Sequence, residues 1–268
     1  MRTRILTAAA ALPPLLALVI FAPAWSFSVI VGLCAAWGLY EVGDMGSASS
    51  PGALLALAIV GGVPAMVMLV WAPPGMFVLA AAAMALMCGL IAQVNLRGAQ
   101  ATISRPLLLV IGGLYVGALY PYLALLRNMA GGVELLLLML LVVMAGDSGA
   151  YLIGSWIGRI RLMPAVSPGK TVEGAVAYVV SSVAAAWILK GLLGLGWSAG
   201  VTTAFAVMLS VVAQLGDLAE SAFKRLAGVK DSGWLFPGHG GLLDRADSLV
   251  FAAVFAYYYS WWLGLAAA

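Results

Sequence analysis

Long apolar stretches with short polar connections run through almost the whole chain. A helix that crosses the lipid core needs about 20 mainly apolar residues. Only 9% of the residues are charged and 64% are hydrophobic, whereas a soluble domain carries about 25% charged residues. The sequence therefore predicts an all-α, polytopic integral membrane protein, with residues 1–268 as a single transmembrane helical domain.

About nine transmembrane helices are expected from the positions of these stretches. Their approximate bounds are 5–23, 25–42, 53–72, 75–94, 106–126, 133–156, 174–195, 199–221 and 247–266. The first one could also be a signal peptide, because a basic start and an apolar core precede Ala22-Pro-Ala24. Further spanning stretches follow at once, which favours a first transmembrane helix over a cleaved segment.

The basic residues divide unequally between the two sides of the membrane. Only Arg127 and Lys190 fall on one side, and the other eleven of the 13 fall on the opposite side. Cytoplasmic loops carry the excess of Lys and Arg, so the N-terminus is expected in the cytoplasm. We predict a multi-pass protein of the inner (cytoplasmic) membrane, with the polar connections 157–173 and 222–246 on the cytoplasmic side. The net charge of +3 does not indicate a nucleic-acid partner.

Two pairs of acids stand at the ends of two predicted helices. Asp217 and Glu220 are three residues apart and share a helix face with Ser221, and Asp244 and Asp247 are again three apart. Such acids can simply face water or favour the helix dipole, but an ionisable residue in a membrane segment is by default a candidate functional group. Four carboxylates on one membrane face could close around Mg²⁺ or Mn²⁺, with substrate phosphates completing the shell. The predicted metal ligands are Asp217, Asp244, Asp247 and Glu220.

The segment between these acids is typical of an anion-binding site. Pro237-Gly238-His239-Gly240-Gly241 is a flexible turn whose backbone N–H groups can face an anion. His239 is either an ordinary hydrogen-bonded loop residue or a contact to phosphate or to a metal-bound water. Positive charge nearby comes from Lys224, Arg225, Lys230 and Arg245.

The other polar connection adds a second set of candidates. Ser167, Lys170 and Thr171 are expected to form a compact anion-binding set at the start of a helix. The stretch is not a P-loop, because Pro164 occupies the position of the first glycine. Upstream, Asp147 places a carboxylate within an apolar helix, where it needs a partner.

Residues Ser221 to Asp247 resemble the signature of the phosphatidate cytidylyltransferases, also called CDP-diacylglycerol synthases. That pattern is S-x-x-K-R, four residues, K-D, then P-G-H-G-G, two residues and D-R-x-D, and each fixed position is present. The D-S-G-A-Y stretch that begins at Asp147 is also similar to the family. One departure is that the family usually has S-P-K-K-T-x-E-G, often with tryptophan at x, where this chain has Gly169 and Val172.

The resemblance implies that a cytidylyl group passes from CTP to phosphatidic acid, giving CDP-diacylglycerol and pyrophosphate in phospholipid biosynthesis. It implies Mg²⁺ (or Mn²⁺) as cofactor and a catalytic part at about residues 141–250. The catalytic residues would be Asp217, Asp244, Asp247, Lys224 and Arg245. The substrate-binding residues would be Ser167, Lys170, Thr171, Ser221, Arg225, Lys230, Asp231, His239, Gly240 and Gly241. The expected partners are CTP, phosphatidic acid and membrane lipid, without nucleic acid, and a homodimer stays open.

Three alternatives remain at this point. A transporter could use intramembrane carboxylates to bind coupling ions, although the acids gather at helix ends instead of the membrane midplane. A related CTP-dependent transferase could use another lipid phosphate as acceptor. A member of the same family could keep the scaffold with altered or weak activity.

Overall fold

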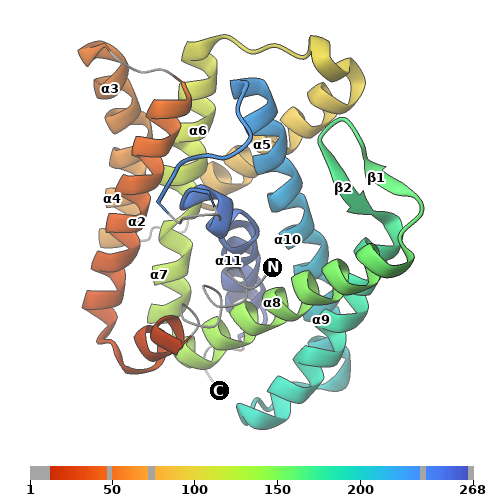
Figure 1. Ribbon diagram of the computed structural model, residues 1–268. Coiled ribbons are helices and arrows are strands. Elements are labelled where there is room, and N and C mark those ends of the chain that lie inside the picture. The colour runs from red at the N-terminus through yellow and green to blue at the C-terminus, as the bar shows by residue number, and fades with distance from the viewer. Residues whose placement is uncertain (1–12, 47–49, 72–75, 236–239, 265–268) are drawn as a thin grey trace.

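The computed structural model describes residues 13–46, 50–71, 76–235 and 240–264. Its long helices are joined by short connections and one β-hairpin (Figure 1). The helices are α2 (Ala24–Met45), α3 (Pro51–Leu57), α4 (Val63–Trp71), α5 (Met76–Arg97), α6 (Arg105–Leu119), α7 (Pro121–Asn128), α8 (Gly132–Ile157), α9 (Val172–Leu192), α10 (Ala199–Ala227) and α11 (Leu243–Trp262). The shorter elements are a π-helical segment η1 (Ala58–Gly62), a 3₁₀ turn η2 (Gly98–Gln100), and the strands β1 (Arg161–Met163) and β2 (Ser167–Thr171).

The prediction of an all-α, polytopic membrane protein is confirmed. Within the described residues, seven helical stretches are long and apolar enough to cross a membrane: Ala24–Met45, Pro51–Met68, Met76–Arg97, Arg105–Asn128, Gly132–Ile157, Val172–Leu192 and Ala199–Ala227. The last predicted span, 247–266, overlaps α11, which is not one of these seven. The first predicted span is described only from residue 13. The number nine and the orientation of the N-terminus therefore stay predictions.

Two of the predicted spans are interrupted. The span predicted at 53–72 is divided into α3, η1 and α4, and η1 packs closely on α6. A Cβ atom at Gly117 would overlap the backbone of Gly61, so small residues allow this contact, as they do between membrane helices. The span predicted at 106–126 breaks before Pro121, because proline has no N–H to continue the α6 ladder.

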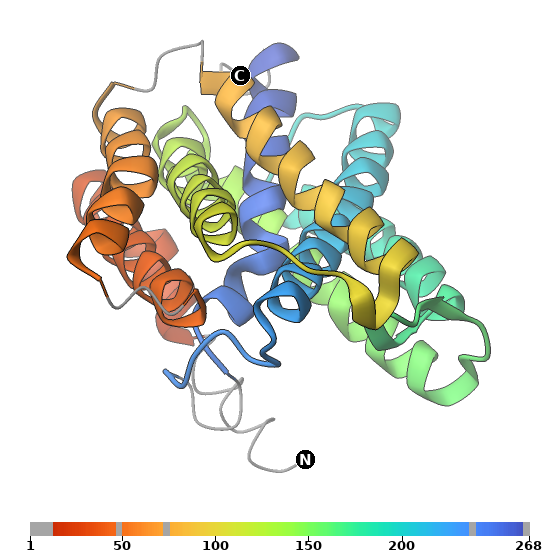
Figure 2. The same cartoon turned by 90° about the horizontal axis from the view of Figure 1, so that it is seen from above.

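The helices form two groups with α11 between them. Helices α2, α3, α4, α6 and α7 lie on one side and α8, α9 and α10 on the other, as the two perpendicular views show (Figures 1 and 2). Helix α11 contacts α10, α7, α8 and α6. Helix α5 crosses over α10 (Figure 2). The C-terminal helix is therefore placed where both halves of the chain can position its side chains.

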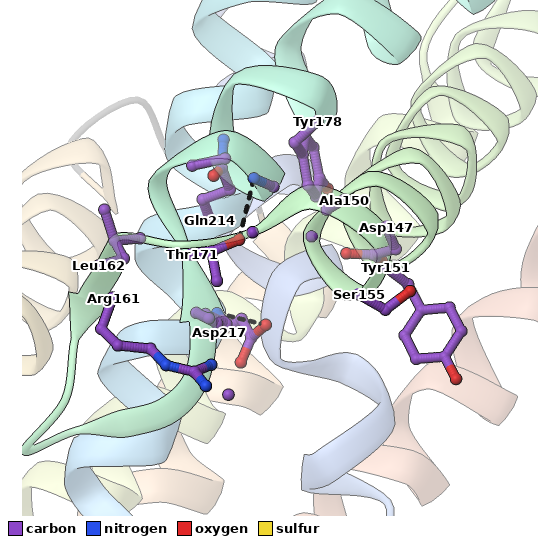
Figure 3. A pocket seen from close by; sticks show the side chains of 16 residues that line it. Asp147, Ala150, Tyr151, Ser155, Arg161, Leu162, Thr171, Tyr178, Gln214 and Asp217 are labelled. Atoms are coloured by element: carbon purple, nitrogen blue, oxygen red, sulfur yellow. Dashed lines mark hydrogen bonds and ion pairs between the residues drawn. The ribbon is translucent and has the colours of Figure 1, made fainter.

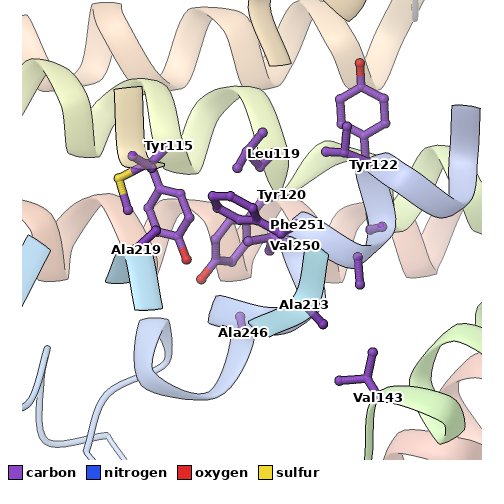
Figure 4. Packing of buried hydrophobic residues seen from close by; sticks show 14 of the residues in the cluster. Tyr115, Leu119, Tyr120, Tyr122, Val143, Ala213, Ala219, Ala246, Val250 and Phe251 are labelled. Atoms are coloured by element: carbon purple, nitrogen blue, oxygen red, sulfur yellow. The ribbon is translucent and has the colours of Figure 1, made fainter. Parts of the chain in front are cut away.

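Aromatic side chains fill the core around α11. Tyr115 lies in α6 and Tyr120 directly follows it. Both side chains are almost completely buried, as is that of Phe251 in α11 (Figure 4). The ring centroid of Tyr115 lies 6.4 Å from that of Tyr120 and 6.3 Å from that of Phe251. Ring pairs at this separation add to the stabilisation from burial, and they fix α11 against the N-terminal group.

The two polar connections differ from the prediction. Residues of the first form an antiparallel hairpin, in which Arg161 pairs with Thr171 and Met163 with Ser167. The expectation that Ser167 and Lys170 stand at the start of a helix is wrong, because both lie in β2. Helix α9 begins only at Val172, and its preceding residue Thr171 accepts a hydrogen bond from the Gly174 backbone N–H at 3.1 Å.

The second connection is shorter than the predicted 222–246. Helix α10 continues to Ala227, where Gly228 takes a left-handed conformation with φ +76° and ends it. A left-handed glycine after the last turn is a common way to stop a helix. Lys224 and Arg225 lie in that last turn, where positive charge is favoured by the helix dipole. Helix α11 then begins at Leu243.

Candidate active site

A polar cavity of about 510 Å³ lies between α8, α9, α10 and the β1–β2 hairpin (Figure 3). Its size is in the range of small-molecule sites, about 300–1,000 Å³. Figure 3 shows Asp147 on α8 and Asp217 on α10, with Arg161 reaching in from the hairpin. The polar side chains that line it are Asp147, Tyr151, Ser155, Arg161, Lys170, Thr171, Tyr178, Gln214 and Asp217. Such a lining of both charge signs suits a charged ligand.

Lys170 and Asp217 meet in this cavity, although one comes from strand β2 and the other from helix α10. The Lys170 Nζ atom lies 2.5 Å from Asp217 Oδ2, and the two side chains are 27% and 31% exposed. An ion pair with this much solvent contact contributes little to stability. Both groups can therefore exchange their partner for a ligand without a large loss of folding free energy.

Two further carboxylates surround Asp217. Asp147 lines the same cavity as Asp217 and Lys170. Asp247 is not in that lining, but Gly216 brings its segment of α11 close to α10, since a Cβ atom at Gly216 would lie 2.6 Å from the Asp247 carbonyl oxygen. We call Asp147, Lys170, Asp217 and Asp247 the cavity cluster.

A second group of charges lies at the start of α11. Lys224 pairs with Asp244 and also with Glu220, whose Oε2 atom is 2.6 Å from its Nζ. Asp244 Oδ2 accepts three more hydrogen bonds, from Ser232 N at 2.9 Å, Ser232 Oγ at 3.0 Å and Gly241 N at 2.7 Å. Ser232 Oγ also donates to the buried Glu41 of α2 at 3.0 Å. We call Glu41, Glu220, Lys224, Ser232 and Asp244 the helix-start cluster.

The four carboxylates predicted as one metal site divide between these two clusters. Among the described residues, no group of three or more His, Cys, Asp or Glu side chains is arranged to hold a metal ion. Asp244 and Glu220 instead pair with Lys224, which lies one turn after Glu220 and neutralises the charge of both carboxylates. Mg²⁺ commonly takes only one or two carboxylates, with phosphates and water as the remaining ligands. Asp217, a partly exposed carboxylate that lines the cavity, fits a cation of that kind, and Asp247 as a ligand stays a prediction.

The glycines of the predicted anion-binding turn contact protein carboxylates. Gly240 has φ +80°, and a Cβ atom there would overlap the Asp244 carboxylate. The Gly241 N–H, which we predicted to face a phosphate, donates to Asp244. These N–H groups hold the helix-start cluster in the described arrangement, and His239 lies outside the described residues.

The other predicted residues occupy varied positions around the cavity. Thr171 lines it, whereas Ser167 of β2 and Ser221 of α10 are half-buried outside its lining. Arg225 donates from Nε to the Val166 carbonyl at 3.4 Å and so supports the hairpin turn. Exposed positions are taken by Lys230, Asp231 and Arg245.

Several residues in or near the two clusters had no assigned role in the prediction. Asp147 was noted as a carboxylate within an apolar helix and as part of a stretch similar to the family, and Arg161 only as one of the basic residues. Arg161 reaches the cavity because β1 pairs with β2, which the sequence did not indicate. Glu41 is 2% exposed and stands in an apolar run. The rule that marks ionisable residues in membrane segments would have found it.

The chain is similar to known proteins along most of its length. Residues 2–263 match the model of the cytidylyltransferase family. A phosphatidate cytidylyltransferase of Synechocystis sp. is 45% identical over 138 residues, which cover 50% of this chain and 45% of that relative. The enzyme of that name from Bacillus subtilis is 38% identical over 151 residues, 56% of each chain. That of Staphylococcus saprophyticus is 42% identical over 137 residues, 51% of this chain and 52% of the relative.

The extent of these matches decides what they establish. The chain spans about half the length of the curated relatives it matches. The family model, by contrast, covers almost every described residue, including both clusters. The protein therefore belongs to the cytidylyltransferase family.

Proposed function

We propose that this protein transfers the cytidylyl group of CTP to phosphatidic acid, giving CDP-diacylglycerol and pyrophosphate. The observation that carries the proposal is the polar cavity in which Lys170 meets Asp217 between membrane-spanning helices. Similarity to proteins named phosphatidate cytidylyltransferase supports the choice of substrates. A lipid phosphate and a nucleotide triphosphate both need such a mixture of basic and acidic groups next to lipid.

The reaction requires no nucleophile from the protein. An oxygen of the lipid phosphate attacks the α-phosphorus of CTP, the bond from that phosphorus to the bridging oxygen breaks, and pyrophosphate leaves with the electron pair. A phosphate monoester has a second pKa of about 6, so the attacking oxygen is already deprotonated at neutral pH. Positioning and charge neutralisation are then the main tasks of the site.

We assign these tasks to three residues that line the cavity, Arg161, Lys170 and Asp217, and to Asp247 beside it. Lys170 and Arg161 bind phosphate oxygens, since both are cations that line the cavity and charge-assisted hydrogen bonds are strong. Asp217 and Asp247 would hold Mg²⁺ or Mn²⁺. When bound, such an ion neutralises the negative charge that develops on the transferring phosphates. The Lys170–Asp217 pair keeps both side chains in place before the substrates enter.

The expected products provide the direct test. The purified chain, in mixed micelles of detergent and phosphatidic acid, should convert CTP labelled at the α-phosphate into labelled CDP-diacylglycerol, with one pyrophosphate released per lipid. Lysophosphatidic acid and phosphatidylglycerol phosphate test for another acceptor. Pyrophosphate release that is independent of phosphatidic acid, or no labelled lipid at all, would rule the proposal out. Ion flux in proteoliposomes without pyrophosphate release would favour the transporter.

We also propose that the cavity faces the cytoplasm across the inner membrane. The support is the excess of basic residues in the connections near the cavity. In a chain with Cys34 and Cys88 replaced by alanine, single cysteines at Ser167 and Lys230 should resist impermeant thiol reagents in whole cells. A cysteine next to Lys190 should react. The opposite pattern would contradict the proposed sidedness.

We also propose that the protein forms a homodimer in the membrane, a question that the sequence left open. Its support is general, since symmetric dimers are the commonest oligomers. Chemical crosslinking of the protein in its native membrane, followed by mass determination, would show a species of twice the chain mass. Only monomer under conditions that crosslink a known dimer would contradict it.

A further inference from the structure

Glu41 is a buried carboxylate from the N-terminal half of the chain. It stands near the end of α2 and is 2% exposed. Burial of a carboxylate is strongly unfavourable unless hydrogen bonds replace its hydration. Four donors do so here: Trp37 Nε1 at 3.0 Å and Leu242 N at 2.8 Å to Oε1, and Leu243 N at 2.9 Å and Ser232 Oγ at 3.0 Å to Oε2.

Two of these donors are the first backbone N–H groups of α11. The first N–H groups of a helix have no partner within the helix, and the N-cap residue Leu242 supplies no side-chain hydrogen bond. Glu41 therefore caps α11 from another helix, across 201 residues of sequence. Its negative charge is also favoured at a helix N-terminus. The capping contact fixes where α11 begins and how it is rotated.

Ser232 joins Glu41 to the rest of the helix-start cluster. Its hydroxyl lies 3.0 Å from both Glu41 Oε2 and Asp244 Oδ2, and its backbone N–H donates to Asp244. A hydroxyl carries a single proton, so the two carboxylates share this one donor and cannot both receive a full hydrogen bond from it. Through Ser232, the position of Glu41 sets the position of Asp244, and Asp247 follows one turn later on the same helix.

The backbone at Gly233 and Gly241 lies directly against the Glu41 carboxylate. A Cβ atom at Gly233 would lie 2.7 Å from Oε1, and one at Gly241 would lie 2.5 and 2.6 Å from the two oxygens. Real Cβ atoms do not approach so closely, so a side chain at either position would have to displace the Glu41 carboxylate. The site admits a side chain of this shape and leaves no space for a bulkier one.

We propose that Glu41 is a positioning residue, which sets the start of α11 and thereby the position of Asp247 relative to the other members of the cavity cluster. Glu41 does not line the cavity, so it acts through α11 and does not touch substrate. The inference rests on the proposed function for its kinetic part. Its structural part, the cap on α11, can be measured independently of activity.

The test replaces Glu41 by glutamine in the full-length protein. The Glu41→Gln amide has nearly the same shape as the carboxylate. Its NH₂ group, however, replaces an oxygen that accepts two hydrogen bonds, so that it faces two donors and can accept from neither. We expect kcat to fall about a hundredfold, because small misplacements at a reacting centre have effects of that size, while KM for CTP and for phosphatidic acid changes less than twofold. Glu134→Gln, the same change in the first turn of α8, is the matched control and should leave kcat unchanged.

Hydrogen–deuterium exchange provides the readout that needs no activity. In Glu41→Gln, the amides of residues 242 and 243 should exchange at least about tenfold faster, with no change in α10, because their opening is local. Unchanged exchange, or a raised KM with normal kcat, would overturn the proposal. An inactive wild-type protein would refute the proposed function instead, and the exchange data would still decide on the cap.

A second variant covers the case in which Glu41→Gln does not accumulate in the membrane. Ser232→Ala removes the shared hydroxyl but keeps the backbone N–H that donates to Asp244. It should lower kcat about tenfold without changing either KM, since one of the two links to Asp244 remains. Normal kcat in a folded Ser232→Ala protein would overturn the inference.

Discussion

Asp244 and Asp247 stand one turn apart on α11, yet they belong to different clusters. Asp244 is enclosed by Lys224, Ser232 and Gly241, and its side chain is 5% exposed. Asp247 is in the segment of α11 that Gly216 brings close to α10. Glu41 and Asp244 of the helix-start cluster are satisfied by donors within the protein, and among the described residues Glu220 is paired with Lys224 alone. The cavity cluster instead keeps a partly exposed ion pair, Lys170 and Asp217.

The comparison shows that two carboxylates on one helix can have different roles, because their surroundings differ. A carboxylate that already has a cation and several N–H donors has no capacity left for a ligand, and its removal disturbs the fold. A carboxylate beside other carboxylates, with part of its surface in a cavity, gains from a cation or a phosphate-bound metal. The variants below separate these two roles, beginning with the largest expected effect.

Asp217→Asn is expected to reduce kcat about a thousandfold. The change removes the central charge of the cavity cluster, and preorganised electrostatic groups have effects of this order. The free energy of unfolding should change by less than about 1 kcal/mol, because the ion pair with Lys170 is partly solvated. Initial rates of CDP-diacylglycerol formation with increasing Mg²⁺ measure the effect. More than a tenth of the wild-type kcat at saturating Mg²⁺ would remove Asp217 from the site.

Asp244→Asn should lower both activity and stability. The carboxamide loses the charge that pairs with Lys224 and presents an NH₂ group to one set of donors. Breaking a buried, hydrogen-bonded charge pair destabilises by about 3 kcal/mol, and we expect kcat to fall about a hundredfold as α11 shifts. Thermal unfolding in detergent, compared with that of Asp217→Asn, measures the difference. If the two variants unfold at the same temperature, the division into two clusters is wrong.

Lys170→Met keeps the length of the side chain and removes its charge. We expect KM for CTP to rise about tenfold, since a lost charge-assisted hydrogen bond of about 1.5 kcal/mol corresponds to that factor. The unfolding temperature should stay within a degree or two of wild type. The matched control is Lys190→Met, a lysine of α9 far along the helix from β2. An equal rise in KM for both variants would show a general effect of charge on CTP binding.

Gly169→Lys restores the lysine that the family pattern has at this position. Gly169 lines the cavity, it is not among the glycines with positive φ, and a Cβ atom there meets nothing within 4 Å. Glycine is therefore not required at this position for a left-handed backbone. KM for CTP or phosphatidic acid should fall, by at most about tenfold at low salt.

Salt and alanine provide the controls for Gly169. The gain should shrink as salt rises, because exposed charges are screened over about 8–10 Å, and Gly169→Ala should be silent. If Gly169→Lys changes neither KM at any salt concentration, residue 169 does not contact substrate.

The class of the protein and the positions of its helices could be predicted from the sequence alone. Both depend on local properties, namely the length of an apolar run and the residues that stop it. Helices α5, α8 and α10 begin within a few residues of the starts that we predicted for them. The similarity around Asp217, Asp244 and Asp247 was readable for the same reason, since a signature is a pattern along the chain.

The tertiary structure alone decided how the charged residues are grouped. The hairpin that brings Arg161 and Lys170 to the cavity depends on pairing between β1 and β2. The separation of Asp244 from Asp247 depends on the rotation of α11, which Glu41 determines from 201 residues away. Spacing along a helix shows which residues share a face, but the partner that the face meets depends on packing between distant segments. For that reason the four acids were found from the sequence, and their two different roles were not.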